Sequence, residues 1–188
     1  ERMTIPPAKP IAPIVVGIGA SAGGLAAFKR FFEHMPPDTG MAFVLVQHLD
    51  PQHKSLLVDL LRPRMTMPVV EASDGTVVAE NCVYIIPRNA TLTIKKGVLH
   101  VVTPAPERAL RRPIDTFFAS LAVDQGERAV AIVLSGVGSD GSLGVKSIKE
   151  HGGLTLAQAE VEAYDEAMRG MPWSAAATGS VDFVLPIE

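Results

Sequence analysis

Three times along the chain, a short run of β-branched and aliphatic residues gives way to a turn and then to apolar residues at helical spacing. The three runs, each with the helical segment after it, are residues 14–18 with 25–32, 42–46 with 54–61, and 129–134 with 142–150. Repeated strand–helix units predict parallel strands, because a helix must carry the chain back across a face of the sheet before the next strand. We therefore expect an α/β fold with a doubly wound, mostly parallel sheet and helices on both faces.

Residues 69–102 have a different pattern, in which glycine, asparagine and proline separate short apolar runs. The last two runs, Thr91–Ile94 and Val98–Val102, lie on either side of Gly97 and predict a β-hairpin. We expect this whole segment to form an antiparallel insertion. The remaining elements expected from periodicity and turn residues are a helix over 114–123, a strand over 153–157, a short helix over 172–177 and a strand over 181–185.

The length and composition restrict the protein to one globular domain of ordinary size. A chain of 188 residues has room for a single compact core, and 47% hydrophobic residues exclude a disordered chain. Residues 1–13 contain four prolines and no periodic apolar pattern, so we expect an extended tail or linker there. Folding is expected to begin at Ile14, with one domain over residues 14–188.

Charge, cysteine content and hydropathy limit the class of partner. The formal net charge of −3 argues against a protein that binds nucleic acid by neutralising its phosphates. The single cysteine, Cys82, permits no internal disulfide and no zinc site built on paired cysteines, which favours a reducing intracellular setting. No apolar run approaches the roughly 20 residues of a membrane helix. We therefore expect a soluble, cytoplasmic protein without membrane insertion.

The glycine-rich segment after the first run contains two overlapping motifs that predict different functions. Its sequence is Gly17-Ile18-Gly19-Ala20-Ser21-Ala22-Gly23-Gly24. Read as Gly-x-Gly-x-x-x-Gly, it is similar to a dinucleotide-binding turn, in which glycines let a pyrophosphate approach the backbone. Read from Gly19 to Gly23, it is the Gly-x-Ser-x-Gly of a nucleophile elbow, with Ser21 as the nucleophile. A third interpretation is a glycine-rich helix start with Ser21 as the N-cap.

The end of the second expected strand favours the nucleophile. A dinucleotide site needs an acidic residue about 20 positions further along, and Asp50 is the candidate for binding the ribose. His48, however, occupies the strand end itself. A histidine there can take the proton from Ser21, because open α/β sheets place their sites at the carboxyl ends of the strands. The alternative is an ordinary surface histidine in a loop.

Asp140 lies in the loop after the third expected strand and supplies the third residue type of a catalytic triad. This loop, residues 135–141, contains three glycines and leads into a helix. An acid can hold the base histidine in the required tautomer and stabilise its charged form. Asp140 can equally cap the helix that follows it. The chain order Ser, His, Asp differs from that of α/β-hydrolases and disfavours an ordinary lipase or esterase.

Together these motifs resemble one family closely, the protein-glutamate methylesterases (CheB) of bacterial chemotaxis. The resemblance spans residues 14–187 and rests on Gly19-Ala20-Ser21-Ala22-Gly23-Gly24, Val46-Gln47-His48, Leu134-Ser135-Gly136-Val137-Gly138-Ser139-Asp140-Gly141, Ala157-Gln158-Ala159-Glu160 and Gly170-Met171-Pro172. It implies that Ser21, His48 and Asp140 form the catalytic triad of a methylesterase domain. The implied reaction is hydrolysis of glutamyl methyl esters on the cytoplasmic helices of chemoreceptors, often with deamidation of glutamines, and without a metal or organic cofactor.

The resemblance also implies partners. They are the methylated cytoplasmic domain of a chemoreceptor, a receiver domain of the kind that usually precedes the esterase, and a fused or separate methyltransferase. A methyltransferase is included because residues 41–51 are similar to those of family members that are fused to a receptor methyltransferase. Two other functions stay open: a nucleotide-binding oxidoreductase that uses the glycine-rich turn, and a non-catalytic scaffold that keeps the fold for receptor binding.

Four further residues are candidates for stabilising the oxyanion or binding substrate, namely Ala22, Val137, Gly138 and Met171. Ala22 stands where many family members have threonine, and Val137 where many have methionine. Main-chain N–H groups near both positions can still serve as oxyanion donors, because they do not depend on the side chain. Another group, which forms either a solvated face or a contact for acidic receptor helices, comprises Arg62, Arg64, Arg111 and Arg112.

Overall fold

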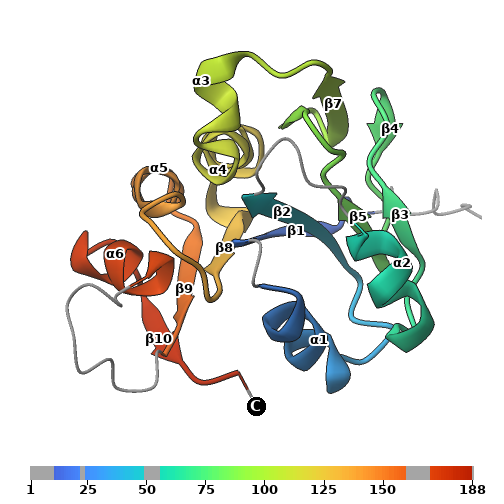
Figure 1. Cartoon of the computed structure of the whole chain (residues 1–188), viewed down its shortest axis with the longest axis horizontal. Helices are drawn as coiled ribbons and strands as arrows, with labels where there is room; N and C mark the ends of the chain where they lie inside the picture. The colour runs from blue at the N-terminus through green and yellow to red at the C-terminus, as the bar shows by residue number, and fades with distance from the viewer. Residues whose placement is uncertain (1–10, 22–23, 49–55, 160–169, 188) are drawn as a thin grey trace, which may run out of the picture.

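The computed structural model describes residues 11–21, 24–48, 56–159 and 170–187, which contain a seven-stranded sheet with helices on both faces (Figure 1). All neighbouring strands in this sheet are parallel, and their order is β10-β9-β8-β1-β2-β5-β3. The strands are β1 (Ile14–Ser21), β2 (Met41–His48), β3 (Val69–Glu71), β5 (Cys82–Ile85), β8 (Val130–Val133), β9 (Leu154–Gln158) and β10 (Phe183–Leu185). The α/β fold expected from the repeated strand–helix units is confirmed.

Two layers of helices cover the sheet (Figure 1). One layer contains α1 (Leu25–Glu33) and α2 (Leu57–Leu61), and the other contains α4 (Pro113–Gln125), α5 (Ser142–Glu150) and α6 (Met171–Ala177), with the short α3 (Glu107–Leu110) leading into α4. Successive side chains of a strand point to opposite faces. In β1, accordingly, Val15 belongs to the core beneath Phe118 of α4, whereas Ile18 belongs to the core that contains Phe28 of α1. The central strands are therefore apolar on both faces.

A small antiparallel sheet packs on the outer side of α4. It contains β4 (Thr76–Val77), β6 (Thr91–Lys95) and β7 (Val98–Val102) in the order β4-β7-β6. The Ile94 N–H donates to Ser120 Oγ of α4 at 3.0 Å, and the Gly97 N–H donates to Asp124 Oδ2 at 3.1 Å. These bonds fix the hairpin to the helix, and the expected β-hairpin is confirmed.

The expectation that all of residues 69–102 form an antiparallel unit is wrong for two strands. β3 and β5 join the parallel sheet instead, with β5 paired to β2 on one side and to β3 on the other. Val83, Tyr84 and Ile85 of β5 are buried. Strands of three and four residues show no periodicity from which direction can be read. β5 takes its place between two parallel neighbours, and β3 pairs with β5 at the edge of the sheet.

β1 is longer than expected, and two of its glycines lie in the strand against α4 instead of forming a turn. Gly17 and Gly19 lie inside the strand on the face covered by α4. A Cβ atom added to Gly17 would lie 2.9 Å from Phe118 Cε1, and one added to Gly19 would lie 2.6 Å from Ile114 Cγ2. Both glycines therefore allow α4 to approach the sheet. Because they lie within the strand, they do not form the turn that a dinucleotide site requires. Helix α1 has Gly24 as its N-cap, so the interpretation of Ser21 as the N-cap is wrong.

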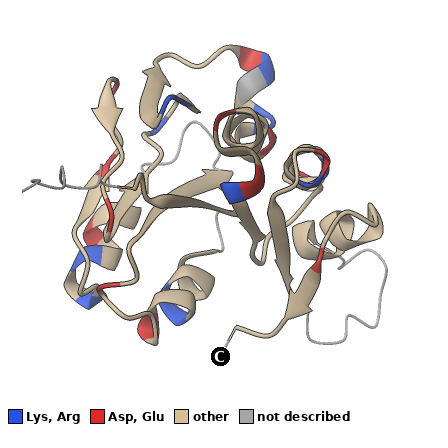
Figure 2. Ribbon diagram, turned by 180° about the vertical axis from the view of Figure 1, so that it is seen from behind, with Lys and Arg blue, Asp and Glu red and all other residues tan. Residues whose placement is uncertain are grey.

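Charged residues lie on the helices and outer segments, and β1, β2 and β8 carry no lysine, arginine, aspartate or glutamate (Figure 2). In the part of the chain that the structure describes, no helix is long and apolar enough to cross a membrane. Within those same residues, no group of three or more His, Cys, Asp or Glu side chains is arranged to hold a metal ion. Residues 1–10 of the expected tail, together with Ala22 and Asp50, lie outside the described residues.

Candidate active site

Ser21 and His48 are the last residues of neighbouring strands at the carboxyl edge of the sheet. In the parallel pairing of β1 with β2, Ser21 lies opposite His48. β1 lies between β2 and β8. The strand order runs outward in one direction from β1 to β2 and in the other direction from β8 to β9, so a topological switch point lies between β1 and β8. Open α/β sheets bind their ligands outside such points. The loop after β8, which carries Asp140, reaches the same edge.

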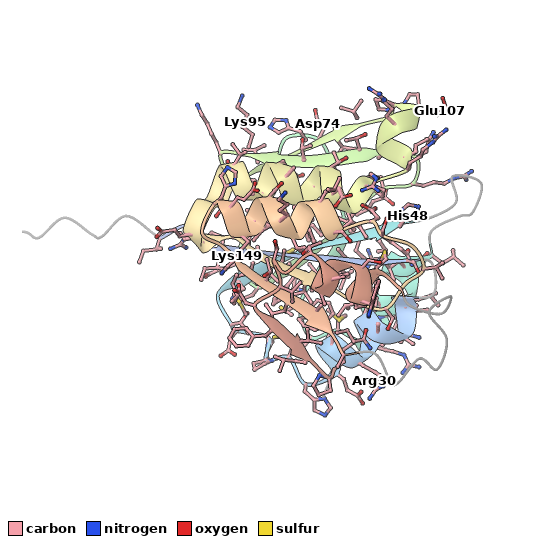
Figure 3. The ribbon with its side chains drawn as sticks, turned by 90° about the vertical axis from the view of Figure 1, so that its left-hand side faces the viewer. Arg30, His48, Asp74, Lys95, Glu107 and Lys149 are labelled. Carbon is pink, nitrogen blue, oxygen red and sulfur yellow. The ribbon has the colours of Figure 1, made fainter. Side chains whose placement is uncertain are left out.

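His48 and Asp140 are in direct contact. The distance between His48 Nδ1 and Asp140 Oδ2 is 3.0 Å, although the residues are 92 positions apart in the sequence. The Asp140 side chain is buried, and the His48 side chain is about one-third exposed. An ionised carboxylate can only accept, so Nδ1 carries the proton and Nε2 is left as an acceptor. Figure 3 shows His48 at the same end of the molecule as Glu107, away from the C-terminal end of α5 where Lys149 lies.

The Asp140 carboxylate also accepts three main-chain N–H groups. Its Oδ2 accepts from Ile114 at 3.0 Å, and its Oδ1 accepts from Asp115 and Gly141, each at 2.9 Å. The first two donors belong to the first turn of α4, where the helix dipole also favours a negative charge. Asp140 is therefore held by groups that stabilise its charged form. The expectation that it caps the helix following it is wrong, since it caps α4 instead.

Asp115 caps α5, the helix that follows Asp140. Its Oδ1 accepts the N–H groups of Gly141 and Gly144, at 3.0 and 2.7 Å, at the start of α5. Its Oδ2 accepts from Arg112 Nη1 at 2.8 Å. Burial raises the pKa of Asp115, and the nearby charge of Asp140 raises it further, while the Gly144 N–H and the Arg112 guanidinium act in the opposite direction. Asp140 thus caps α4, the helix that contains Asp115, and Asp115 caps α5, the helix that follows Asp140.

The glycine loop after β8 lies against Ser21. The Ser21 N–H donates to the Ser135 carbonyl at 3.4 Å. Gln158 of β9 holds Ser135 in turn, because its Oε1 accepts the Ser135 N–H at 2.8 Å and the Ser135 hydroxyl at 2.7 Å. The Met171 N–H donates to the Gly136 carbonyl at 2.8 Å, which ties the start of α6 to the same loop.

The structure separates the four residues expected at the oxyanion or substrate site. Met171 is fully buried beside Gly136. The Val137 side chain is exposed at the tip of the loop, and Gly138 has a φ of +96° with its carbonyl 3.3 Å from Ser174 Oγ. Ala22 lies outside the described residues. Met171 therefore supports the loop from below, while Val137 and Gly138 form its outer part.

Gly136 is expected to tolerate no side chain, because an added Cβ would lie 2.6 Å from Met171 Cε and 2.7 Å from Ser21 Cβ. Gly136→Ala should push the loop away from the serine and slow the reaction of Ser21 with a serine-directed fluorophosphonate about 10²-fold, a loss that a 1 Å misplacement can cause. The overpacking should also lower the free energy of unfolding by about 1–3 kcal/mol. Gly97→Ala is the matched control, since its Cβ would meet nothing within 4 Å on the distant hairpin.

Both variants should unfold more easily than the original protein. Gly136→Ala is overpacked, and Gly97 has a φ of +70° that alanine adopts poorly. Only Gly136→Ala should label slowly. The measurements are chemical denaturation and the rate of fluorophosphonate labelling at a temperature where both variants are folded. An unchanged labelling rate in folded Gly136→Ala would show that the loop does not need to lie against Ser21.

Sequence reasoning did not predict that three residues support this site: Arg112, Asp115 and Gln158. The available signal for the first two was the sequence Arg-Pro-x-Asp, with proline at the first position of a helix and aspartate in its first turn. That pattern is typical of any helix start, so it gave no reason to select Asp115. Two of the four arginines whose role was left open have partners within the chain. Arg112 pairs with Asp115, and Arg62 donates to the Val69 carbonyl.

The chain is similar to known proteins over almost all of its length. Residues 16–188 match the family model described as CheB methylesterase. The chain is 36% identical over 180 residues to a protein-glutamate methylesterase/protein-glutamine glutaminase of Cupriavidus metallidurans, covering 95% of this chain and 52% of that protein. It is 35% identical over 179 residues to the protein of the same name from Geobacillus kaustophilus, covering 93% of this chain and 50% of that protein.

The fold is similar to a solved structure of the same family. The crystal structure of the Thermotoga maritima CheB methylesterase catalytic domain superimposes with a TM-score of 0.80 at 28% identity, covering 94% of each chain. The chain spans about half the length of the curated relatives it matches. Family model, relatives and fold agree over almost all of the sequence, and the chain therefore belongs to the CheB methylesterase family.

Proposed function

We propose that this chain is a serine hydrolase that removes methyl groups from glutamyl methyl esters on the cytoplasmic helices of chemoreceptors, using Ser21, His48 and Asp140. One observation carries the proposal. The buried Asp140 carboxylate holds His48 Nδ1 at 3.0 Å on the strand end next to Ser21. A nucleophile, a base and an acid that orients the base are the three parts that acyl transfer by serine requires.

In the first half of the reaction, Ser21 Oγ attacks the carbonyl carbon of the ester, and its proton passes to His48 Nε2. Asp140 accepts the Nδ1 proton in a hydrogen bond and stabilises the imidazolium that forms. The ester carbonyl oxygen becomes a tetrahedral oxyanion. The C–O bond to the methoxy group then breaks, His48 returns its proton, and methanol leaves.

In the second half, water hydrolyses the acyl-enzyme. His48 takes a proton from the water, the hydroxyl adds to the carbonyl carbon, and the bond to Ser21 Oγ breaks as His48 returns the proton to it. The product is a free glutamate carboxylate. The same sequence with a glutamine amide releases ammonia in place of methanol, which corresponds to the glutaminase part of the relatives' name.

Stabilisation of the oxyanion falls to main-chain N–H groups after Ser21 and in the outer part of the glycine loop, at Ala22 and at Val137–Gly138. Such donors act in a partly water-excluded site and contribute typically 10²–10³-fold in rate. The proposal does not require a hydroxyl at Ala22 or a thioether at Val137, because both positions would act through the main chain. Met171, buried beneath the loop, would hold it in place.

The proposed protein context follows that of the family. The substrate is a methylated receptor helix in the cytoplasm, and a receiver domain and a receptor methyltransferase act with the esterase, either in the same chain or separately. The support is the name that the curated relatives share and their length, about twice the span matched here. A receptor helix is a wider object than one ester group, so the recognition surface extends beyond the catalytic residues.

Methanol release from a methylated receptor fragment tests the proposal. The chain is incubated with the methylated cytoplasmic domain, and with the same domain lacking methyl esters, and methanol is measured over time. We expect release from the methylated domain only. A serine-directed fluorophosphonate provides the second measurement, with peptide mapping of the labelled residue, and we expect the label on Ser21.

Three outcomes separate the competing functions. Methanol release together with a label on Ser21 supports the esterase. A folded protein that binds the receptor, releases no methanol under conditions where a control esterase works, and takes no label would be a scaffold. A rise in melting temperature with NAD, without hydrolysis, would support the oxidoreductase and contradict the proposal.

A further inference from the structure

The N-termini of α4 and α5 are joined by a reciprocal pair of carboxylate caps. Asp140, which precedes α5, accepts N–H groups of α4, and Asp115, in the first turn of α4, accepts N–H groups of α5. The two helices lie side by side on the same face of the sheet (Figure 1). Through this exchange the position of Asp140 depends on a residue 25 positions earlier in the chain.

Both carboxylates bind the same donor. The Gly141 N–H lies 2.9 Å from Asp140 Oδ1 and 3.0 Å from Asp115 Oδ1, so two negatively charged oxygens converge on one hydrogen. Like charges at this separation repel in a buried setting. Arg112, whose Nη1 lies 2.8 Å from Asp115 Oδ2, compensates part of that charge from the exposed side. The arrangement therefore contains a cation that favours the ionised form of Asp115 and a shared donor that couples Asp115 to Asp140.

Gly141 is the point at which this coupling acts on the loop. It follows Asp140 directly and has a φ of +94°, a conformation that glycine adopts without strain. Its N–H is bound by Asp115, and the Gly144 N–H one turn further on is bound by the same Oδ1.

We propose that Asp115 is a positioning residue of the esterase, which holds Gly141 and Gly144 so that the carboxylate of Asp140 stays within hydrogen-bond distance of His48. This inference rests on the proposed function and extends it, because Asp115 touches neither His48 nor the reacting atoms. Arg112 assists by pairing with Asp115. Burial and the charge of Asp140 raise the pKa of Asp115, so a pairing cation is what this carboxyl needs to remain an acceptor on both of its oxygens.

The test compares Asp115 with a second aspartate that does similar structural work elsewhere. Asp182 accepts the Thr155 N–H at 3.0 Å and pairs with Lys149 at 2.6 Å. Lys149 lies well away from His48 in Figure 3. Asp115→Ala and Asp182→Ala both remove a carboxylate that accepts a main-chain N–H and pairs with a cation. Only the first removes support from Asp140.

We expect the rate of fluorophosphonate labelling at Ser21, and kcat for ester hydrolysis, to fall about ten- to a hundredfold in Asp115→Ala. KM should change less than kcat, because Asp115 does not touch the substrate. Asp182→Ala should label and turn over at the original rate. Asp115→Asn, which keeps an acceptor oxygen for Gly141 and Gly144, should lie between the original protein and Asp115→Ala.

A spectroscopic measurement separates positioning from general loosening of the fold. The proton on His48 Nδ1, hydrogen-bonded to a carboxylate, gives a far-downfield proton NMR signal. That signal should shift upfield or broaden in Asp115→Ala and stay in place in Asp182→Ala. It requires no substrate, so it reports on the His48–Asp140 contact whether or not the protein is an esterase.

The outcomes distinguish this inference from the function on which it rests. If the original protein releases no methanol and Ser21 takes no label, the proposed function is wrong, and the NMR comparison alone decides the role of Asp115. If the original protein is active and Asp115→Ala matches Asp182→Ala in labelling, kcat and NMR signal, Asp115 is only a helix cap. Should Asp115→Ala fail to fold, the same comparison is made with Asp115→Asn and Asp182→Asn.

Discussion

Ser21→Ala is expected to lower ester hydrolysis about 10⁶-fold, the loss measured when a serine protease loses its nucleophile. Without Oγ no acyl-enzyme forms, and the residual rate is what the oxyanion donors and substrate binding sustain. The fold should be unaffected, because Ser21 contacts the glycine loop through its main-chain N–H, which alanine retains. Methanol release and fluorophosphonate labelling are the measurements, and both should disappear.

Ser147→Ala is the matched control for this change. Ser147 lies on α5 and is partly exposed, and its hydroxyl donates to the Leu143 carbonyl at 3.3 Å. Its loss should leave hydrolysis and labelling unchanged. If Ser21→Ala keeps more than a small fraction of the activity, another group is the nucleophile and the proposed triad is wrong.

Asp140→Asn is expected to lower kcat about 10⁴-fold, as the corresponding replacement does in serine proteases. The amide of asparagine can donate to His48 Nδ1, which favours the tautomer that has its proton on Nε2 and so cannot accept one from Ser21. The negative charge that stabilises the imidazolium is lost as well. The measurement is kcat and KM for ester hydrolysis, with KM expected to change much less than kcat.

The same replacement is expected to destabilise the fold. Asp140 Oδ2 accepts hydrogen bonds from His48 Nδ1 and the Ile114 N–H, and Oδ1 accepts from the N–H groups of Asp115 and Gly141. An asparagine must therefore place its NH₂ group against at least one main-chain N–H, which leaves that buried donor without an acceptor at a cost of about 1–3 kcal/mol. Chemical denaturation measures this loss. Activity is then compared at a temperature where the variant is folded.

Asp124→Asn controls for loss of stability alone. Asp124 also accepts main-chain N–H groups, those of Lys96 and Gly97, but it does so at the hairpin on the outer side of α4. It should lose stability and keep its turnover. If folded Asp140→Asn hydrolyses the ester at nearly the original rate, Asp140 serves only to cap α4.

The double variant distinguishes a triad from independent contributions. When two residues act as one unit, removing the second costs little after the first is gone. Ser21→Ala combined with Asp140→Asn should therefore be scarcely slower than Ser21→Ala alone, whereas independent effects would multiply. Multiplication of the two losses would contradict the assignment of both residues to one catalytic unit.

The sequence alone was sufficient for the part of the fold that depends on local periodicity. β1, β2 and β8 are long or strongly apolar runs followed by helical patterns, and the parallel order follows from that alternation. It was also sufficient for the convergence of Ser21, His48 and Asp140. Residues at the carboxyl ends of parallel strands share one edge wherever the strands lie in the sheet, so this expectation needed no contact to be known in advance.

Short strands were beyond the reach of that reasoning. β3 and β5 contain too few residues to show a period, and their direction was decided by pairing in the tertiary structure, β5 with β2 and β3 with β5. The glycines of β1 were misread for a related reason. Gly17 and Gly19 look like turn residues in the sequence, but only the approach of α4 shows why a side chain is excluded there.

The supports of Asp140 are the clearest case of what tertiary structure alone decided. Asp140 stands just before α5, so the sequence offered capping of that helix as the alternative to a role as the triad acid. In the fold it caps α4, while Asp115 of α4 caps α5, because the sheet places the two helix starts side by side. Local sequence determines which residues can act as caps. Which N–H groups they bind depends on the packing of helices that are remote in the sequence, and so only the tertiary structure shows that Asp140 caps α4 while Asp115 caps α5.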